Sequence, residues 1–275
     1  MSQTMSIAFE GPPGAFTVKK VKGKFVFVKN YLLKNKGVNR ALTKVVGVEK
    51  RALNLLNVKM PHDLVKKGFK KQKEELKAII EKEVRTNRLW LENGVLTPRI
   101  IDYDSISLTS EFIPSKNFYE LIGGDYKPSL LDEMFLAYQN IRMKSLSKDD
   151  PEMLHLDPHS KNFLKTSFGD VYAIDSSFLL KEGADTKTVD SIVNGLFLLQ
   201  LENLNSDNEI FAANVEYCKK LFGSEIKRTK LPKINCLSIL YFKLRENVAH
   251  KIKRRPYDFN ESSFKNYEIL RKIIS

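Results

Sequence analysis

The sequence predicts an α+β protein, with a small β-rich first part and a larger helical second part. The first thirty residues alternate β-prone runs with turn residues, as in "AFTVKKV", "KGK" and "KFVFVKNY", which is the pattern of a β-hairpin. From "NFYELI" onward the helical period dominates, except in one polar stretch at 154–177. The change falls near residues 113–117, so we place a first domain at 1–113 and a second at 114–275.

Composition and charge narrow the class of protein. The 275 residues are 42% hydrophobic and 29% charged, as in an ordinary globular protein. The formal net charge of +13 favours an anionic neighbour, either nucleic acid, a membrane surface or a phosphorylated substrate. No apolar run approaches the roughly 20 residues that span a bilayer, and "MSQTMSIAFEG" lacks the regions of a signal peptide. We therefore expect a cytoplasmic protein whose Cys218 and Cys236 are reduced thiols.

The strand predicted from "KFVFVKNY" carries the first candidate functional residue. Because side chains alternate along a strand, Phe25, Phe27 and Lys29 share one face, and the lysine lies among aromatic rings. The "GPPG" turn before this hairpin ends at Gly14. It lacks the G-x-G-x-x-G pattern, and its prolines remove N–H groups that could bind phosphate. A strongly basic, helix-prone insertion follows at about 32–73.

A helix is predicted from "EELKAIIEKEVRTNRLWLENG", which ends at Gly94. Its apolar stripe includes Ile80 and Trp90, and the helical period places Glu83 in the middle of that stripe and Glu81 on the far side. A carboxylate that faces the core is costly unless a cation meets it. The sequence therefore predicts a basic partner for Glu83. Two further strands are predicted from "VLTPRIIDYDSISLTSEFIP".

The polar stretch "LHLDPHSKNFLKTSFGDVYAIDSS" allows more than one chemistry. His155, Asp157 and His159 alternate, so on an extended segment they point the same way, as ligands of zinc or iron do. The chain has only four histidines, and the other two lie in no ligand-like cluster. A closed coordination sphere needs more donors than these residues supply, so the transition-metal interpretation is disfavoured.

The second interpretation is a phosphoryl-transfer site. "NFLK", the turn "TSFGD" and "VYAID" predict a β-hairpin that brings Asp175 back beside Asn162. Carboxylate and amide oxygens are the ligands that Mg²⁺ prefers, and a further carboxylate orients the attacking hydroxyl. Asn162 and Asp175 are therefore the candidate metal ligands, and Asp157 is the candidate for orienting the attacking hydroxyl.

These residues resemble the protein-kinase-like superfamily, particularly its bacterial small-molecule branches. "HLDPHSKN" is similar to the "HGDxHxxN" catalytic loop of aminoglycoside phosphotransferases and of the heptose and Kdo kinases of the lipopolysaccharide core. "AIDSS" is similar to their Mg²⁺-binding segment, although Leu156 replaces the usual Gly of the loop. The resemblance implies a two-lobed fold with an N-lobe at 1–113, a C-lobe at 114–275, and ATP and Mg²⁺ as cofactors.

The resemblance also gives roles to residues of the N-lobe. Lys29, in "FVFVK", is similar to the lysine that contacts the α- and β-phosphates of ATP. Glu83, followed by "GVLTP", is similar to the glutamate that pairs with that lysine, and Glu49 is the alternative because its spacing from Lys29 is nearer the usual one. Gly14 is the candidate phosphate contact of the "GPPG" turn.

Further roles follow for the segment between the lobes and for the C-lobe. The backbone groups from Glu111 to Ile113, in "SEFIP", would bind adenine. The resemblance implies that His155 packs and hydrogen-bonds to hold the catalytic loop, that His159 contacts the active site and that Asp190 supports the loop. The helical extension over 201–275 matches no part of the family.

The expected activity is transfer of the γ-phosphate of ATP to an acceptor hydroxyl. "DPHSKNF" is most similar to the heptose kinases, which favours a lipopolysaccharide-core sugar and an enzyme at the inner membrane surface. The basic stretches "KKGFKKQK" and "HKIKRRPYD" suit a phosphorylated or anionic acceptor, glycolipid or protein, or an anionic membrane. They carry few aromatic residues, so no specific nucleic acid is expected. A protein Ser/Thr kinase, such as a secreted effector, and a non-catalytic kinase-like binding module are the alternatives.

Overall fold

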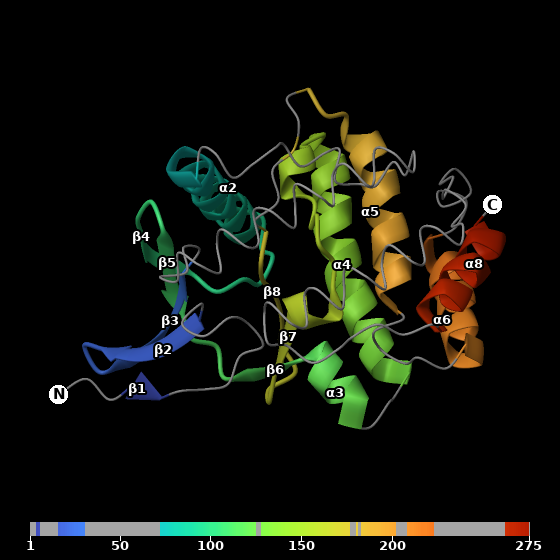
Figure 1. The fold of residues 1–275 in the computed structure, drawn as a ribbon, viewed down its shortest axis with the longest axis horizontal. Coiled ribbons are helices and arrows are strands. Elements are labelled where there is room, and N and C mark those ends of the chain that lie inside the picture. Colours follow the sequence, from blue (N-terminus) through green and yellow to red (C-terminus); the bar gives the residue numbers. More distant parts are fainter. Residues whose placement is uncertain are drawn as a thin grey trace. The chain divides into compact units, whose positions relative to one another are not determined.

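The computed structural model is α+β, as predicted, with antiparallel sheets and a set of helices (Figure 1). It describes residues 4–5, 16–30, 72–124, 128–176, 180, 183–201, 208–222 and 262–274. The chain divides into two units, each made of several segments, and one of the boundaries lies between Phe112 and Ile113. Residues 16–30, 72–81 and 100–112 belong to the first unit, whereas 82–99, which the sequence placed in the first domain, belong to the second.

The first unit contains a five-stranded antiparallel sheet. Its strands are β1 (Thr4–Met5), β2 (Phe16–Val21), β3 (Lys24–Asn30), β4 (Ile100–Tyr103) and β5 (Ser107–Glu111), in the order β1-β2-β3-β5-β4. The predicted β2–β3 hairpin is present, and its turn residues Lys22 and Gly23 have φ angles of 47° and 82°. Two successive positive φ angles are typical of the type I′ turn, which fits the twist of a hairpin.

The register of this sheet fixes the face on which Lys29 lies. Directly opposed residues of neighbouring strands share a face, and β3 pairs Phe27 with Ser110 and Lys29 with Leu108. Lys29 and Phe27 therefore share a face, as predicted, and the fully buried Leu108 lies on that face too. Lys29 is half-buried there.

Helix α2 (Gln72–Glu92) continues from the first unit into the second. Its predicted end is confirmed: Gly94 has a φ of 67°, and the amide of Val95 donates to the carbonyl of Trp90 at 2.9 Å. Glycine tolerates this left-handed conformation, so it commonly ends a helix. The predicted faces are confirmed as well, because Ile80, Glu83 and Trp90 are buried and Glu81 is exposed.

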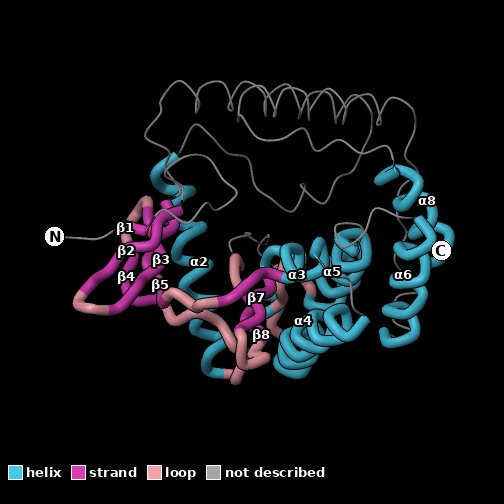
Figure 2. The backbone as a smooth tube through the Cα atoms, turned by 90° about the horizontal axis from the view of Figure 1, so that it is seen from below, coloured by secondary structure: helices cyan, strands magenta, loops and turns pink. Residues whose placement is uncertain are grey.

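The second unit consists mainly of helices around a small sheet. Strands β6 (Ser115–Asn117), β7 (Phe163–Thr166) and β8 (Val171–Ala173) form that sheet in sequence order. The helices are α3 (Phe118–Gly124), α4 (Pro128–Lys148), α5 (Thr186–Gln200), α6 (Asn208–Phe222) and α8 (Ser262–Ile274), with short 3-10 helices η2 (Pro151–Met153) and η3 (Ser160–Asn162). Helices α4 and α5 lie side by side, as do α6 and α8 (Figure 2).

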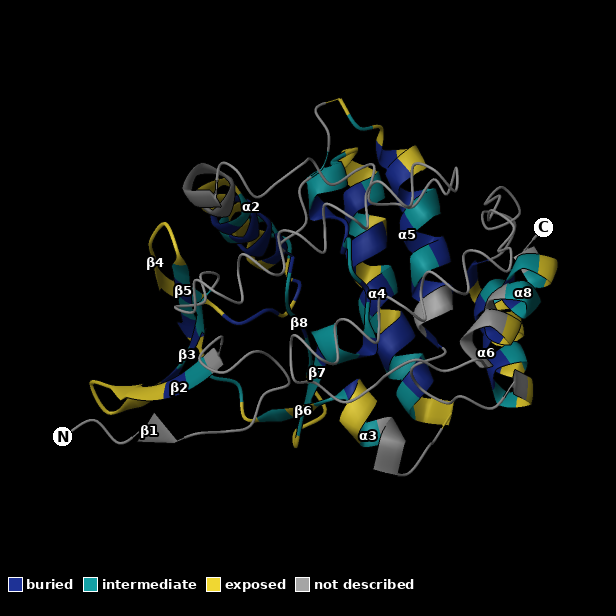
Figure 3. Ribbon diagram, viewed as in Figure 1, coloured by how far each residue is buried: buried dark blue, intermediate teal, exposed yellow. Residues whose placement is uncertain are grey.

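An aromatic cluster forms the core of the second unit, where the inner faces of α4 and α5 are buried (Figure 3). The rings of Tyr138 and Phe197 stack with centroids 4.5 Å apart, and Phe222 packs edge-on against both. Such contacts add to the free energy gained from apolar burial. Leu154, Phe163 and Ala173 belong to this core, so β7, β8 and the loop before them pack on it.

The remaining sequence expectations concern the thiols and membrane spans. Cys218 is a buried free thiol on α6, and burial raises its pKa to about 12. Cys236 and the larger part of the basic insertion lie outside the described residues. None of the described helices is long and apolar enough to cross a membrane.

Candidate functional site

The loop between η2 and η3 holds Asp157 and Asn162 together. The side-chain amide of Asn162 donates to the backbone carbonyl of Asp157 at 2.9 Å and to its carboxylate at 3.2 Å. The amide of His159 also donates to the Asp157 carbonyl, and the amide of Asn162 donates to the His159 carbonyl, both at 2.7 Å. These bonds make a tight turn that presents the half-buried Asp157 carboxylate beside Asn162.

The predicted β7–β8 hairpin is confirmed, with Phe163 opposite Ala173. One residue further on, the amide of Ile174 donates to the carbonyl of Asn162 at 2.9 Å. The hairpin therefore returns the chain to the loop just before Asp175. Asp175 has a φ of 61°, a conformation that costs a non-glycine residue energy and that is concentrated at functional sites.

His155 is buried in the apolar support of this loop. Its ring lies between Trp90 and Phe163, with centroid distances of 5.3 and 5.0 Å. Burial lowers the pKa of His155 to about 4, although the nearby Asp175 carboxylate opposes the shift. The imidazole is therefore neutral near pH 7. The backbone at Asn162 and Ile174 also favours the protonated ring, but burial outweighs these contributions, and the side chain packs here against Trp90 and Phe163.

His159 caps the 3-10 helix that ends at Asn162. Its Nδ1 accepts a hydrogen bond from the amide of Lys161 at 3.0 Å. The Lys161 ammonium lies over the ring of Tyr119, 4.3 Å from the centroid. These contacts stabilise the part of the turn that follows Asp157 in the sequence.

Asn162 and Asp175 are the residues beside this loop that could contribute metal ligands. No cluster of three or more His, Cys, Asp or Glu side chains that could hold a metal is present in the part of the chain that the structure describes. The two hydrogen bonds of the Asn162 side chain use its amide nitrogen, which leaves the amide oxygen as a neutral ligand. Together with the Asp175 carboxylate, this oxygen is a donor of the kind that Mg²⁺ prefers when phosphate and water complete its sphere.

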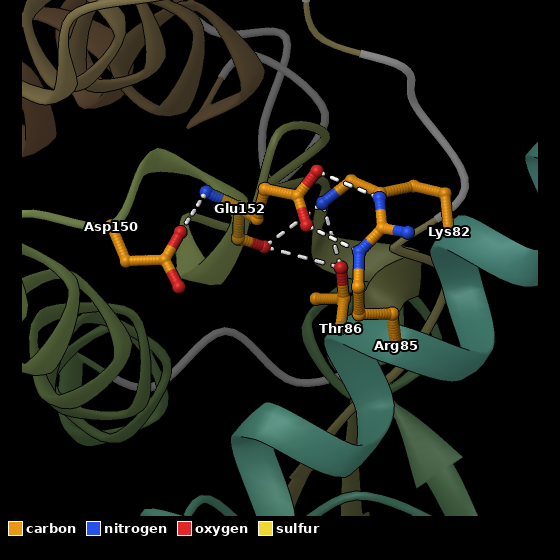
Figure 4. Close-up of polar contacts among 5 residues, drawn as sticks. All are labelled: Lys82, Arg85, Thr86, Asp150 and Glu152. Atoms are coloured by element: carbon orange, nitrogen blue, oxygen red, sulfur yellow. Dashed lines mark hydrogen bonds and ion pairs between the residues drawn. The ribbon is translucent and has the colours of Figure 1, made fainter.

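A second polar cluster joins α2 to the entrance of the loop (Figure 4). Lys82 is 2% exposed, and its ammonium donates to the hydroxyl of Thr86 at 2.7 Å and to the carbonyl of Glu152 at 3.0 Å. The Thr86 hydroxyl donates to the same carbonyl at 3.1 Å. Burial lowers the pKa of Lys82 to about 8, while the Glu152 carboxylate opposes that shift.

Two further contacts extend this cluster along α2. Arg85 forms a two-point ion pair with the Glu152 carboxylate, at 2.5 and 2.7 Å, which lowers the pKa of Glu152. One turn beyond Thr86, the indole N–H of Trp90 donates to the carbonyl of Met153 at 2.7 Å. One face of α2 therefore holds η2, which leads directly into His155 and Asp157.

Asp190 belongs to a buried polar network between α5 and α4, and its expected support of the loop stays a prediction. Its two carboxylate oxygens accept from Arg142 of α4 at 2.7 and 2.8 Å, and one also accepts from Asn194 at 3.1 Å. Asn194 accepts in turn from the Tyr138 hydroxyl at 2.6 Å. Asp190 thus joins α5 to α4 through a buried ion pair, and none of these bonds reaches the loop at 154–162.

The other predicted residues belong to separate parts of the structure. Lys29 and Glu111 lie on strands of the first unit, whereas Glu83 and Ile113 belong to the second. The pairing of Lys29 with Glu83, and adenine binding by the segment from Glu111 to Ile113, stay predictions. Gly14 and the alternative partner Glu49 lie outside the described residues.

Sequence reasoning missed the cluster of Lys82, Arg85 and Glu152. The helical period does place Lys82, Thr86 and Trp90 on one face, four residues apart, and this was the available signal. No local pattern indicates that their acceptors lie about 70 residues later in the chain. No protein-family model matches the sequence, and a search of curated proteins finds no relative.

Proposed function

We propose that the protein is an ATP-dependent phosphotransferase that transfers the γ-phosphate to an acceptor hydroxyl. The observation that carries the proposal is the arrangement of three polar residues. The side chain of Asn162 is bonded to Asp157, and the β7–β8 hairpin returns the chain to Asn162 immediately before Asp175. Phosphoryl transfer needs oxygen ligands for the metal and a carboxylate that orients the nucleophile, and this group offers both.

The proposed reaction assigns one task to each residue. Asp157 orients the acceptor hydroxyl and accepts its proton as the oxygen attacks the γ-phosphorus. A new P–O bond forms, the bond to the bridging oxygen breaks, and ADP leaves. Asn162 holds Asp157 through the two bonds at 2.9 and 3.2 Å. When bound, Mg²⁺ would neutralise charge on the phosphates, with Asn162 and Asp175 as its protein ligands.

The neutral and buried state of His155 supports a positioning role for that residue. Its buried ring supports the loop without adding a positive charge near the Asp175 carboxylate. The two-lobed kinase-like fold, with Lys29 paired to Glu83 across ATP, is part of this proposal. The proposed acceptor is a lipopolysaccharide-core sugar, for which the loop sequence at 154–163 is the support.

The test measures transfer from labelled ATP in the presence of Mg²⁺, with core glycolipid, general protein substrates or no acceptor. We expect label in the glycolipid, and we expect Asp157→Asn to reduce transfer by about 10²–10⁴-fold while ATP affinity stays nearly unchanged. Asp175→Asn should weaken Mg·ATP binding. Asp170→Asn is the matched control, because Asp170 is exposed in the turn of the same hairpin.

The outcomes separate the alternatives. Label only in protein would replace the sugar acceptor by a protein one and would keep the assigned roles. ATP binding without transfer to any acceptor would favour a non-catalytic binding module. Transfer at the wild-type rate in Asp157→Asn would refute the role of Asp157.

A further inference from the structure

The tip of the β2–β3 hairpin projects beyond the strands described on either side. Pairing with β1 reaches Lys19 at its farthest, where it lies opposite Thr4, and pairing with β5 reaches Val26, opposite Glu111. Among the described strands, residues 20–25 are therefore paired only with one another. Both turn residues have the positive φ angles of a type I′ turn, so the tip has a defined backbone conformation.

The tip combines cations with exposed apolar side chains. Lys19, Lys20, Lys22 and Lys24 are all exposed, and the stretch 16–30 contains no acidic residue. Among these lysines, Val21 is 48% and Phe25 is 42% exposed, and the whole tip is exposed in Figure 3. Phe25 pairs with Lys20 and Val21 pairs with Lys24, so each face of the tip carries one exposed apolar side chain beside a lysine.

Other charges on this sheet leave the tip strongly positive. The strand register places Ser107 opposite Asn30, so Asp104, in the β4–β5 turn, lies at the other end of β3. Glu111, opposite Val26, is the carboxylate nearest to the tip in the register. Among the described strands of this sheet, four lysines of the tip therefore outnumber the one nearby carboxylate, which favours an anionic partner.

The environment of Phe25 distinguishes between anionic partners. The Lys20 ammonium lies over the ring, 5.8 Å from its centroid, and the ring of Phe112 approaches it at a T-shaped angle, with centroids 6.4 Å apart. A base of a single-stranded nucleic acid needs an open aromatic face on which to stack. Here a cation occupies one face, whereas insertion of the ring edge into a lipid headgroup layer needs no open face.

We propose that this tip docks the protein on an anionic lipid surface. The four lysines would lie at the level of the lipid phosphates, and Val21 and Phe25 would enter the boundary between headgroups and acyl chains. The inference is independent of the proposed phosphotransferase activity, because none of these residues has a role in that reaction.

The test is co-sedimentation of the full chain with phosphatidylcholine vesicles that contain or lack phosphatidylglycerol. We expect binding only with phosphatidylglycerol, and weaker binding at high salt because salt screens the charges. Each lysine near an anionic surface contributes about fivefold in affinity. Replacing the four lysines of the tip by Gln should therefore weaken binding by at least about a hundredfold.

A matched control separates the tip from the net charge. Replacing Lys116, Lys148, Lys187 and Lys272 by Gln removes the same charge from exposed positions elsewhere, and this variant should bind within a few-fold of the wild type. Val21→Ser keeps every lysine and should leave a weaker binding that high salt abolishes. Because these side chains are exposed, the variants should keep the wild-type circular dichroism and melting temperature.

Several results would overturn the proposal. They are absence of binding to the phosphatidylglycerol vesicles, full binding by the tip variant, or equal losses in the tip and control variants. Binding of single-stranded RNA that the tip variant loses, while its vesicle binding persists, would assign the tip to nucleic acid instead.

Discussion

Lys82 makes the stability of the protein depend on pH in a way that can be calculated. The residue is 2% exposed, and burial lowers the pKa of its amine from 10.5 to about 8. In the unfolded chain the amine keeps its ordinary pKa, so between the two values the unfolded state holds a proton that the folded state has lost. The free energy of unfolding must therefore rise with pH through this window.

The size of the effect follows from the shift. One pKa unit corresponds to about 1.4 kcal/mol, so the contribution of Lys82 should rise by between about 2 and 3 kcal/mol from about pH 7 to about pH 10. Lys82→Met removes both the buried charge and its hydrogen bonds to Thr86 and Glu152. Near neutral pH, the stability gained by removing the buried charge offsets the stability lost with the hydrogen bonds. We therefore expect little net change in the free energy of unfolding there. At high pH the variant should be less stable than the wild type.

The assay is urea unfolding of both proteins across this pH range, because the difference between them removes the titration of all other groups. Lys77→Met is the control, since Lys77 lies on the same helix with its side chain 64% exposed. That variant keeps the buried amine of Lys82, so its stability should rise with pH as that of the wild type does. If the difference between wild type and Lys82→Met changed by less than about 1 kcal/mol over the range, the reasoning about the buried ammonium would be refuted.

Two further predictions concern buried contacts of the second unit, and both are measured by urea unfolding. Arg142→Met leaves the carboxylate of Asp190 buried without its cation and should lower the free energy of unfolding by about 3–5 kcal/mol. Adding Asp190→Asn should recover much of that loss, and a failure to recover it would show that charge is not the cause. Trp90→Phe deprives the Met153 carbonyl of its donor at 2.7 Å and should cost about 1–3 kcal/mol, so wild-type stability in that variant would contradict the assigned bond.

Much of the local structure could be predicted from the sequence. The β7–β8 hairpin, the β2–β3 hairpin and the end of α2 at Gly94 were predicted correctly, because turn residues and the two-residue and helical periods act over short distances. The burial of Glu83 and the exposure of Glu81 followed from the helical period in the same way. The proximity of Asp157, Asn162 and Asp175 needed only one hairpin between them.

Partners that are distant along the chain could not be predicted. The period placed Lys82 on a helix, but nothing in its neighbourhood indicated a bond to the carbonyl of Glu152, 70 residues away. The partner of Asp190 is distant as well, since the structure pairs this carboxylate with Arg142 on α4, 48 residues away along the chain. A buried carboxylate pairs with the cation that helix packing brings near it. That packing cannot be predicted from local sequence patterns, so the partner could not be predicted either.

The sequence by itself determined the α+β class, the local hairpins and the short loop whose residues carry the proposed chemistry. Residues within one turn or one hairpin are brought together by backbone geometry that their own types favour. Only the tertiary structure decided that burial between Trp90 and Phe163 keeps His155 neutral, and that Lys82 and Trp90 hold η2. Burial and the choice of distant partners depend on how elements pack, and that packing fixes both the desolvation of a charge and the acceptor that satisfies it.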